Sequence, residues 1–172
     1  MNPEPRTSVE QHRAEAPKNV VCAVITVSDT RTEADDRSGG YILDSLKGAG
    51  HEVALYRIVK DEPAQIKQAV AEAVEKGVRV VLISGGTGIT SRDQTYETVS
   101  SLIEKRMDGF GEIFRVLSYE DIGPAAMLSR AVAGTHRNML LFSMPGSTGA
   151  VKLAMEKLLL PELGHVVREL NK

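Results

Sequence analysis

Two long apolar stretches constrain the fold of this chain more than any other feature of its sequence. Residues 20–28 (VVCAVITVS) and 78–84 (VRVVLIS) are rich in β-branched side chains and nearly continuous in apolar character. Strands without a polar face are buried on both sides, as in a parallel sheet that helices cover. Residues 138–144 (NMLLFSM) form a similar stretch. We therefore expect all three to be core strands of one parallel sheet.

The segments between these strands have the periodicity of helices. Residues 41–50 place apolar side chains on one helical face, and residues 51–60 (HEVALYRIVK) alternate like a strand nearer the sheet edge. The next helix carries an apolar stripe at intervals of three and four, formed by Ile66, Ala69, Val70, Ala73 and Val74. This order, β-α-β-α-β, predicts an α/β fold with a mainly parallel sheet and right-handed crossovers.

The second half of the chain is less regular. We expect a helix over 94–106, followed over 108–130 by a mixture of short helices and irregular chain. A long helix begins near Ser147, and Pro161 breaks or bends it. We find no internal repeat and no second domain, so residues 19–172 are expected to form a single domain.

The first 18 residues differ in composition from the rest of the chain. Residues 1–18 contain three prolines and no Leu, Ile or Phe. Such a segment cannot bury enough apolar area to offset its ordering entropy, which predicts a disordered N-terminal tail. The segment also lacks the apolar core of a signal peptide, so we expect the protein to remain in the cytoplasm.

The composition argues against several classes of protein. A formal net charge of −2 is unlike that of proteins that coat nucleic acid, and no apolar run approaches the roughly 18 residues of a membrane-spanning helix. The single cysteine, Cys22, cannot form an internal disulfide and is expected to be a small buried hydrophobe. The four histidines are far apart in the chain and have no metal-ligand spacing, so we predict no histidine metal site.

Polar or glycine-rich residues follow all four predicted strands. In an open α/β sheet, ligands bind at the carboxyl ends of the parallel strands. We therefore expect a ligand site where these four ends meet. The segments are Ser28-Asp29-Thr30, Lys60-Asp61-Glu62, Ser84-Gly85-Gly86-Thr87-Gly88 and Met144-Pro145-Gly146-Ser147.

Two of these segments are suited to bind anions. Glycines in 84–88 (SGGTG) allow backbone N–H groups to approach a ligand, and successive N–H groups can form an anion-binding nest. A plain tight turn is the alternative interpretation. The segment is neither a Walker A loop nor a dinucleotide fingerprint, because it lacks Gly-Lys-Ser/Thr and the third glycine. Pro145-Gly146-Ser147 opens a predicted helix whose N-terminus attracts anions, although Ser147 is also a natural cap.

Asp61 and Asp93 are the carboxylates of greatest interest. Asp93 lies just after the glycine loop and is a candidate ligand for a Mg²⁺ ion that bridges phosphates, since hard cations prefer carboxylate oxygens. A helix cap is the alternative role for each residue, and Pro63 strengthens it for Asp61.

At these residues the chain resembles the molybdenum cofactor biosynthesis protein B (MoaB/MogA) family, which is related to the plant and animal molybdopterin adenylyltransferase domains. The resemblance covers about residues 18–170. Single motifs are weak, but the ordered set at these spacings is highly specific. Its six segments are ITVSDTRTEADDRSG at 25–39, IVKDE at 58–62, SGGTGITSRDQT at 84–95, GFGEIFR at 109–115, SRAVAG at 129–134 and MPGSTGA at 144–150.

The resemblance implies a three-layer α/β/α fold of the molybdopterin-binding-domain type, and a homotrimer or homohexamer. It also implies Mg-ATP-dependent adenylylation of molybdopterin before molybdate insertion, with Asp61 and Asp93 as catalytic carboxylates and Asp93 as the main Mg²⁺ ligand. The implied binding residues for pterin phosphate and nucleotide are Ser28, Asp29, Ser84, Gly85, Gly86, Thr87, Gly88, Pro145, Gly146 and Ser147.

Three functions stay open at this point. Gln94-Thr95 after Asp93, and Thr148-Gly149 after Ser147, depart from the commoner family pattern and place the chain nearer the B branch. The first hypothesis is the adenylyltransferase, favoured by the presence of both aspartates. The second is a non-catalytic molybdopterin carrier or scaffold. The third is an unrelated small-molecule enzyme on the same scaffold, because a fold does not determine a function. We expect no nucleic-acid or membrane partner.

Overall fold

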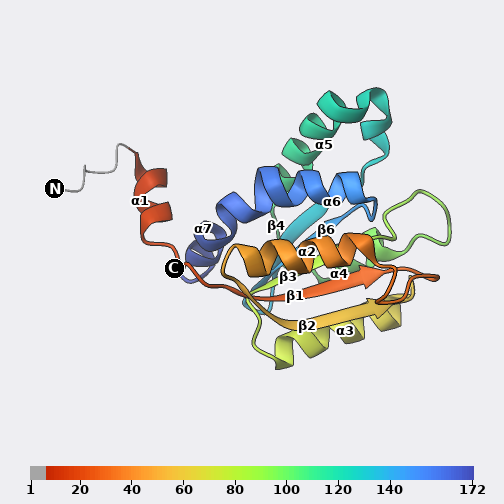
Figure 1. Ribbon diagram of the computed structural model, residues 1–172, viewed down its shortest axis with the longest axis horizontal. Helices are drawn as coiled ribbons and strands as arrows, with labels where there is room; N and C mark the ends of the chain where they lie inside the picture. Colours follow the sequence, from red (N-terminus) through yellow and green to blue (C-terminus); the bar gives the residue numbers. More distant parts are fainter. Residues whose placement is uncertain (1–6) are drawn as a thin grey trace.

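Six strands form one sheet in the computed structural model, which describes residues 7–172. Their spatial order is β2-β1-β3-β6-β5-β4 (Figure 1). The first four run parallel to one another, and the last two add an antiparallel edge. The prediction of a mainly parallel sheet is therefore confirmed. The strands are β1 (Val21–Val27), β2 (Glu52–Val59), β3 (Val80–Ser84), β4 (Lys105–Arg106), β5 (Val132–His136) and β6 (Met139–Met144).

The register of the central strands brings their carboxyl ends to one edge. Thr26 of β1 lies opposite Ser84 of β3, and Ser84 lies opposite Met144 of β6. The loops that follow these three residues consequently leave the sheet side by side. This alignment decides where the polar segments after the strands meet.

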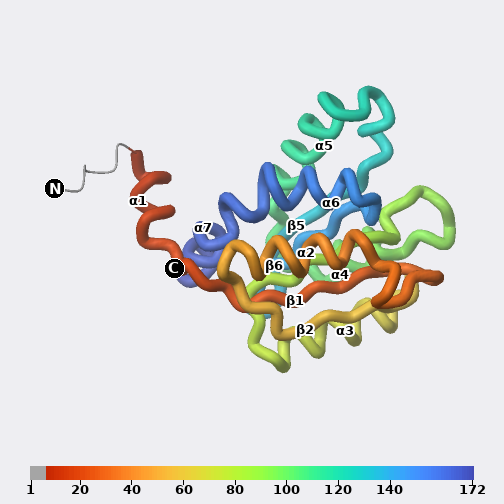
Figure 2. Tube along the Cα trace, viewed as in Figure 1, coloured from red at the N-terminus to blue at the C-terminus, as the bar shows by residue number. Residues whose placement is uncertain are grey.

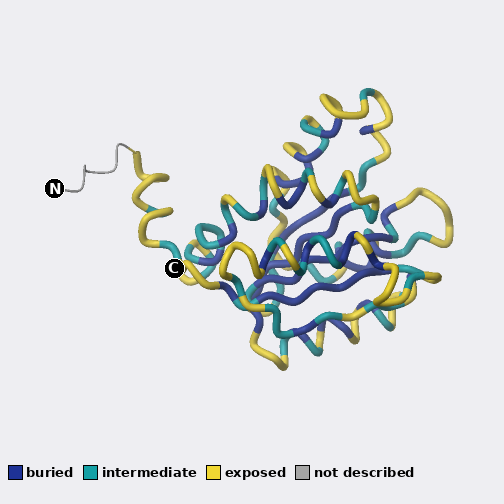
Figure 3. The backbone as a smooth tube through the Cα atoms, viewed as in Figure 1, coloured by how far each residue is buried: buried dark blue, intermediate teal, exposed yellow. Residues whose placement is uncertain are grey.

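Helices cover both faces of the sheet, which gives the three expected layers (Figures 1 and 3). One face is covered by α2 (Arg37–Gly48), α5 (Asp108–Ile122), α6 (Thr148–Ala154) and α7 (Leu160–Leu170), and the other by α3 (Pro63–Glu75) and α4 (Thr95–Leu102).

Alternate residues of the central strands divide between two cores. Val24 and Leu82 pack under α2 and α6, whereas Ile25 and Ile83 pack against α3. All four side chains are fully buried. Cys22 is buried as expected, and burial raises the pKa of its thiol to about 12, so the thiolate nucleophile is absent near neutral pH.

The region expected to be irregular, 108–130, is instead a long helix followed by a 3₁₀ segment, Gly123–Leu128. The sequence of this segment does not show the apolar spacing of one helical face, because α5 carries apolar residues on two sides. Phe110 and Phe114 face the core, and Phe110 packs edge-on to Phe142 at 5.1 Å between ring centroids. Ile113 and Val116, on the same helix, are exposed.

The strands β4 and β5 do not follow from the apolar pattern. β5 and β6 form a hairpin whose turn places Arg137 and Asn138 at φ of 44° and 66°, a conformation for which glycine is the usual signal.

The helix expected over 94–106 ends at Leu102, because the next residues extend to pair with β5. Pro161 does not break the chain's last helix, the first of the two predicted effects, since a π-helical turn over Met155–Leu159 carries α6 directly into α7.

The structure differs from the expected tail over part of the first 18 residues. A helix, α1 (Ser8–Ala14), starts with a capping box between Thr7 and Glu10 and lies beside α7 (Figure 2). Ion pairs rather than apolar burial hold it there, which is why hydrophobic composition did not predict it. Residues 1–6 of the expected tail lie outside the described residues. Within the described part of the chain, no helix is long and apolar enough to cross a membrane.

Candidate functional site

A polar cleft of about 300 Å³ lies at the carboxyl ends of β1 and β3, beside the start of α6. It brings together nine of the twelve residues expected at the site, and only Asp29, Asp61 and Pro145 are outside its lining. The lining residues are Thr26, Val27, Ser28, Arg31, Asp36, Ser84, Gly85, Gly86, Thr87, Gly88, Asp93, Gly146 and Ser147.

The glycine loop forms the floor of this cleft. Gly85 and Gly86 have φ of +102° and +63°, a conformation that L side chains rarely adopt. A Cβ on Gly85 would lie 2.2 Å from the Val27 carbonyl oxygen, so the loop passes directly over β1. Among the hydrogen bonds of residues 7–172, none uses the N–H of Gly86 or Thr87 as donor. Both groups are therefore available to an anion.

The Ser84 hydroxyl lies beneath the loop. It is fully buried and has no hydrogen-bond partner in the described part of the chain. Ser84 belongs to the cleft lining, but its Oγ is closed to solvent, so a ligand oxygen would reach it only after the loop moved.

Asp93 lies at the rim of the cleft as an ionised carboxylate. Its Oδ2 accepts hydrogen bonds from Thr90 N and Thr90 Oγ1 at 3.0 and 2.5 Å, which leaves Oδ1 for a cation. The hydroxyl bond from Thr90 is the main reason that the pKa of Asp93 is lowered. Asp93 does not cap α4, whose N-cap residue is Gln94.

Asp61 occupies a different position from the one expected. It is buried beneath Gly86, and its Oδ1 accepts hydrogen bonds from Gln94 N at 3.1 Å and Thr95 Oγ1 at 3.0 Å. It thus holds the start of α4, whereas α3 begins at Pro63 and its N-cap residue, Glu62, makes no side-chain cap. Burial raises the pKa of Asp61. The Asp61 carboxylate anchors α4 and is not among the residues that line the cleft.

Asp29 links two of the loops around the cleft. Its Oδ2 forms an ion pair with Arg92 Nη2 at 2.9 Å, and its Oδ1 accepts a hydrogen bond from Asp61 N at 3.2 Å. The backbone bond from Asp61, followed by the Arg92 bond, lowers the pKa of Asp29. The loop after β1 is in this way tied to the segment that carries Asp93.

The fourth strand end contributes backbone and a cap. The Gly146 carbonyl accepts a hydrogen bond from Ser38 Oγ at 2.8 Å, and a Cβ on Gly146 would meet Gly85 Cα at 2.9 Å. Ser147 Oγ accepts from Ala150 N at 3.3 Å, which confirms the capping alternative for Ser147. Its cap role is compatible with its position in the cleft lining.

Several residues of the site were missed in the sequence: Arg130 and the cleft-lining Thr26, Val27, Arg31 and Asp36. Arg130, just before β5, donates from Nε to the Thr87 carbonyl at 3.0 Å and also contacts the Gly88 carbonyl and Glu97. Its guanidinium lies 4.9 Å from the centre of the Tyr96 ring. Because Arg130 is far from the glycine loop in sequence, only the folded chain shows that it anchors this loop.

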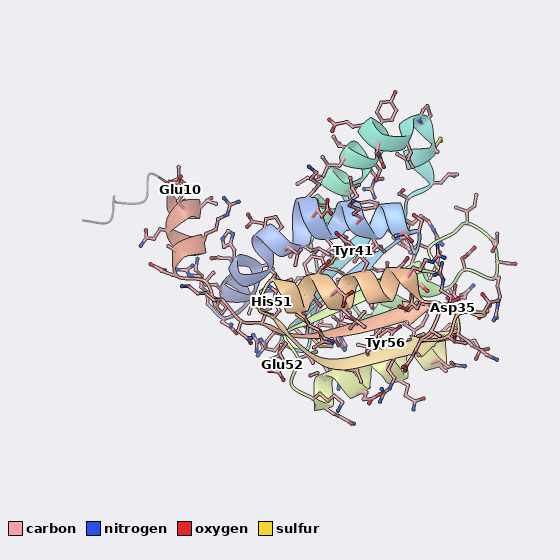
Figure 4. All side chains as sticks on the ribbon, viewed as in Figure 1. Glu10, Asp35, Tyr41, His51, Glu52 and Tyr56 are labelled. Carbon is pink, nitrogen blue, oxygen red and sulfur yellow. The ribbon has the colours of Figure 1, made fainter. Side chains whose placement is uncertain are left out.

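Asp36 is another residue that was missed. It is buried in the cleft wall, where Oδ2 accepts from Tyr56 OH at 2.7 Å and Oδ1 accepts from Gly39 N at 2.9 Å. Figure 4 labels Tyr56 on β2. It also labels Asp35, the residue before Asp36, in the loop at the strand ends. An aspartate three residues before the N–H group that it accepts from is typical of an N-cap. This spacing, from Asp36 to Gly39, could have indicated the role of Asp36 in the sequence.

The cleft can bind an anion together with a cation. Backbone N–H groups and Arg31 supply donors, and Asp93 supplies a charged oxygen. In residues 7–172, no group of three His, Cys, Asp or Glu side chains converges on this cleft. A divalent cation there would need oxygens from the ligand in addition to Asp93, as is usual for Mg²⁺ with phosphates.

Gly86→Ala is expected to destabilise the protein more than Gly77→Ala. Both glycines have φ near +65°, at +63° and +67°, so each alanine adds about 1–2 kcal/mol of backbone strain. At Gly77 the new Cβ meets nothing within 4 Å, whereas at Gly86 it would lie 2.0 Å from Thr95 Oγ1. We expect an extra loss of about 1–3 kcal/mol in urea unfolding of Gly86→Ala. Equal losses would contradict the tight packing of the loop.

The raised pKa of Asp61 predicts a specific pH dependence. Just above pH 3.8 the folded chain still holds the carboxyl proton of Asp61, whereas the unfolded chain has released it. The contribution of this carboxyl to the free energy of unfolding therefore falls as the pH rises from 3.8 through the folded-state pKa. Asp61→Asn keeps an oxygen acceptor but cannot ionise. Its stability relative to the natural chain should therefore increase as the pH rises from about 4 to about 7, as measured by urea unfolding.

Asp61→Ala is the companion variant for this measurement. It removes the acceptor for Gln94 N and Thr95 Oγ1, so it should be less stable than Asp61→Asn by about 1–3 kcal/mol at every pH. A difference between Asp61→Asn and the natural chain that does not change with pH would contradict the burial of an ionisable carboxyl at this position.

Comparisons with known proteins agree with one another over nearly the whole chain. A family model described as "Probable molybdopterin binding domain" matches residues 23–165. A Bacillus cereus protein named molybdenum cofactor biosynthesis protein B is 56% identical over 167 residues, which cover 96% of this chain and 99% of that protein.

Two crystal structures have the same fold. One, of a molybdenum cofactor biosynthesis protein B, has a TM-score of 0.87 at 57% identity and covers 91% of this chain and 98% of its own. The other, of the tungsten cofactor synthesizing protein MoaB from Pyrococcus furiosus, has a TM-score of 0.84 at 39% identity and covers 91% of this chain and all of its own (100%).

The matched region includes every residue that lines the cleft. The resemblance found in the six sequence segments is thereby confirmed. The chain belongs to the molybdenum cofactor biosynthesis family that is defined by this probable molybdopterin binding domain.

Proposed function

We propose that the protein adenylylates molybdopterin with Mg-ATP, before molybdate insertion. In this reaction an oxygen of the terminal phosphate of molybdopterin forms a bond to the α-phosphorus of ATP. The bond from that phosphorus to the bridging oxygen breaks, and pyrophosphate leaves. The observation that supports the proposal is the lining of the cleft, which combines the Gly86 and Thr87 N–H groups, unpaired within residues 7–172, with the Asp93 carboxylate, whose pKa is lowered.

The cleft supplies what a transfer between two polyanions needs. The reactants repel each other, so catalysis depends on holding them in line and on offsetting their charge. Donors from 84–88 and Arg31 are suited to the phosphate oxygens. Mg²⁺, when bound with ATP, would neutralise phosphate charge, and Asp93 is the residue that would hold it. The fixed loop keeps these donors oriented before substrate arrives.

The remaining site residues have supporting roles in this proposal. Ser28 and Asp29 flank the pterin phosphate, and 145–147 flank the nucleotide. Asp61 acts as a positioning residue, because it holds Gln94 and Thr95 next to Asp93 and does not itself line the cleft. In this proposal Asp61 supports Asp93 from outside the cleft, where the resemblance implies a second catalytic carboxylate.

A non-catalytic carrier or scaffold for molybdopterin is the second candidate function. The buried position of Asp61 favours it, because only Asp93 of the two expected carboxylates reaches the cleft. Such a protein would bind the pterin through the same anion-binding loop and would transfer no adenylyl group. The relatives named molybdenum cofactor biosynthesis protein B are compatible with either function.

Asp93→Asn is expected to lower the rate of adenylyl transfer by about 100-fold or more, because it removes the charge that would hold Mg²⁺. Purified protein is incubated with molybdopterin, ATP and Mg²⁺, and the adenylylated pterin is measured by chromatography. Asp44→Asn, on the exposed side of α2, is the matched control and should keep full activity.

The outcomes separate the two candidate functions. Product from the natural chain and from Asp44→Asn, with little from Asp93→Asn, would support the transferase. Normal turnover by Asp93→Asn would contradict the role of Asp93. Molybdopterin binding by the natural chain without any product would favour the carrier.

We also propose that the chain forms a homotrimer or homohexamer through α5. We expect the contact between subunits in the apolar segment 107–128, where Phe110 and Phe114 face the core and are not available for it. The outer side of α5 and of the 3₁₀ segment exposes a run of large apolar residues, which is unusual for a surface that faces water. They are Ile113, Val116, Tyr119, Ile122, Met127 and Leu128.

Val116→Glu should dissociate this assembly, because Val116 is 61% exposed in the single chain and a buried charge opposes association. Sedimentation velocity at micromolar concentration should show a trimer or hexamer for the natural chain and a monomer for the variant. Lys67→Glu, on exposed α3 across the sheet, should leave the assembly intact. A natural chain that sediments as a compact monomer would refute the proposal.

A further inference from the structure

Two histidines and a glutamate converge at the end of the molecule opposite the cleft. His12 lies on α1, and His165 and Glu169 lie on α7. Potential metal-ligand atoms of all three lie within 4.8 Å of one another. Figure 4 labels His51 at this same end of the sheet, away from Asp35 and the strand-end loops. No spacing in the sequence indicates the group, because α1 and α7 are at opposite ends of the chain.

The distances suit a small divalent metal. His12 Nδ1 and Glu169 Oε1 are 3.2 Å apart, and His165 Nε2 and Glu169 Oε1 are 3.8 Å apart. Ligands about 2.0–2.1 Å from a tetrahedral zinc lie roughly 3.3 Å from one another. Only small side-chain movements are therefore needed to place an ion between these three atoms.

Glu162 orients one of the histidines for this role. His165 Nδ1 is 2.7 Å from Glu162 Oε2. A carboxylate bonded to one imidazole nitrogen fixes the ring and leaves the other nitrogen for a metal, an arrangement that is common around zinc. Here that other nitrogen, Nε2, is the one that faces Glu169. The His165 side chain is only 17% exposed, so the ring is held in place.

The surroundings set the chemical class of the metal. Two imidazoles and one carboxylate favour zinc-like transition metals over Mg²⁺, which prefers oxygen ligands. Glu169 is also contacted by Arg168 at 2.9 Å and by Lys172 at 2.8 Å, so a metal must compete with these two cations for the carboxylate.

We propose that His12, His165 and Glu169 bind a divalent transition metal of the zinc class, which fastens α1 to α7. Helix α1 has no buried residue, and the ion pairs Arg13–Glu162 and Arg168–Glu15 also attach this segment to α7. Exposed ion pairs contribute little stability, so a metal would add most of the attachment. A pocket lined by His165 opens beside the group and would admit a water as fourth ligand.

The first experiment measures metal binding by the full chain without an affinity tag. Metal-free protein is titrated with Zn²⁺ in competition with a chromophoric chelator. We expect one tightly bound Zn²⁺ per chain, an affinity at least about 10-fold lower for His12→Ala and for His165→Ala, and no competition from Mg²⁺. His136→Ala, a histidine of β5, is the matched control and should bind like the natural chain.

Lys172→Ala is expected to raise the affinity for Zn²⁺, whereas the histidine variants lower it. It removes a cation that competes for Glu169, so Zn²⁺ should bind more tightly than to the natural chain. Amide hydrogen exchange supplies a second readout. Zn²⁺ should slow exchange in residues 8–14 of the natural chain and leave it unchanged in His12→Ala.

Three results would each overturn the proposal. One is a chain that binds no Zn²⁺ in competition with the chelator. Another is binding that is equally strong in both His12→Ala and His165→Ala, which would place the ion elsewhere. The third is binding that leaves exchange in residues 8–14 unchanged, because the ion would then not join the two helices.

Discussion

Burial of β1, β3 and β6 on both faces is the constraint on which the rest of the structure depends. Apolar side chains on both faces force helices to cover each side, and the crossovers then make the strands parallel. In-register pairing aligns Thr26, Ser84 and Met144 at one edge. The polar segments that follow must leave the sheet together. The cleft is thus a consequence of how the core is built.

Loops without regular structure are held at this edge by charged groups. Asp61 holds the start of α4, Arg130 holds the glycine loop by its carbonyls, and Asp29 pairs with Arg92. Three aspartates of similar chemistry consequently have different tasks. Burial raises the pKa of Asp61, while hydrogen bonds lower the pKa of Asp93 and keep it charged at the cleft. These contacts order the loops around the cleft, with Asp93 at its rim.

Sequence patterns predicted the elements whose burial is regular and missed those whose burial is not. The central strands, α3 and the glycine loop follow from apolar periodicity and from glycine content. In α5, core-facing Phe110 and outward Val116 together conceal the period. β5 pairs through a turn without glycine, and α1 is attached by ion pairs, so neither leaves a hydrophobic signal.

The sequence by itself determined the α/β class, the parallel core and most of the residues that line the cleft. The class and the core follow from local patterns, because strand burial and turn chemistry are encoded in neighbouring residues. The family followed from the resemblance of six ordered segments. Only the tertiary structure decided that Asp61 lies beneath the loop, that Arg130 anchors it, and that His12 meets His165. Each of these contacts joins segments far apart in the chain, and the folded sheet alone sets which distant side chains meet.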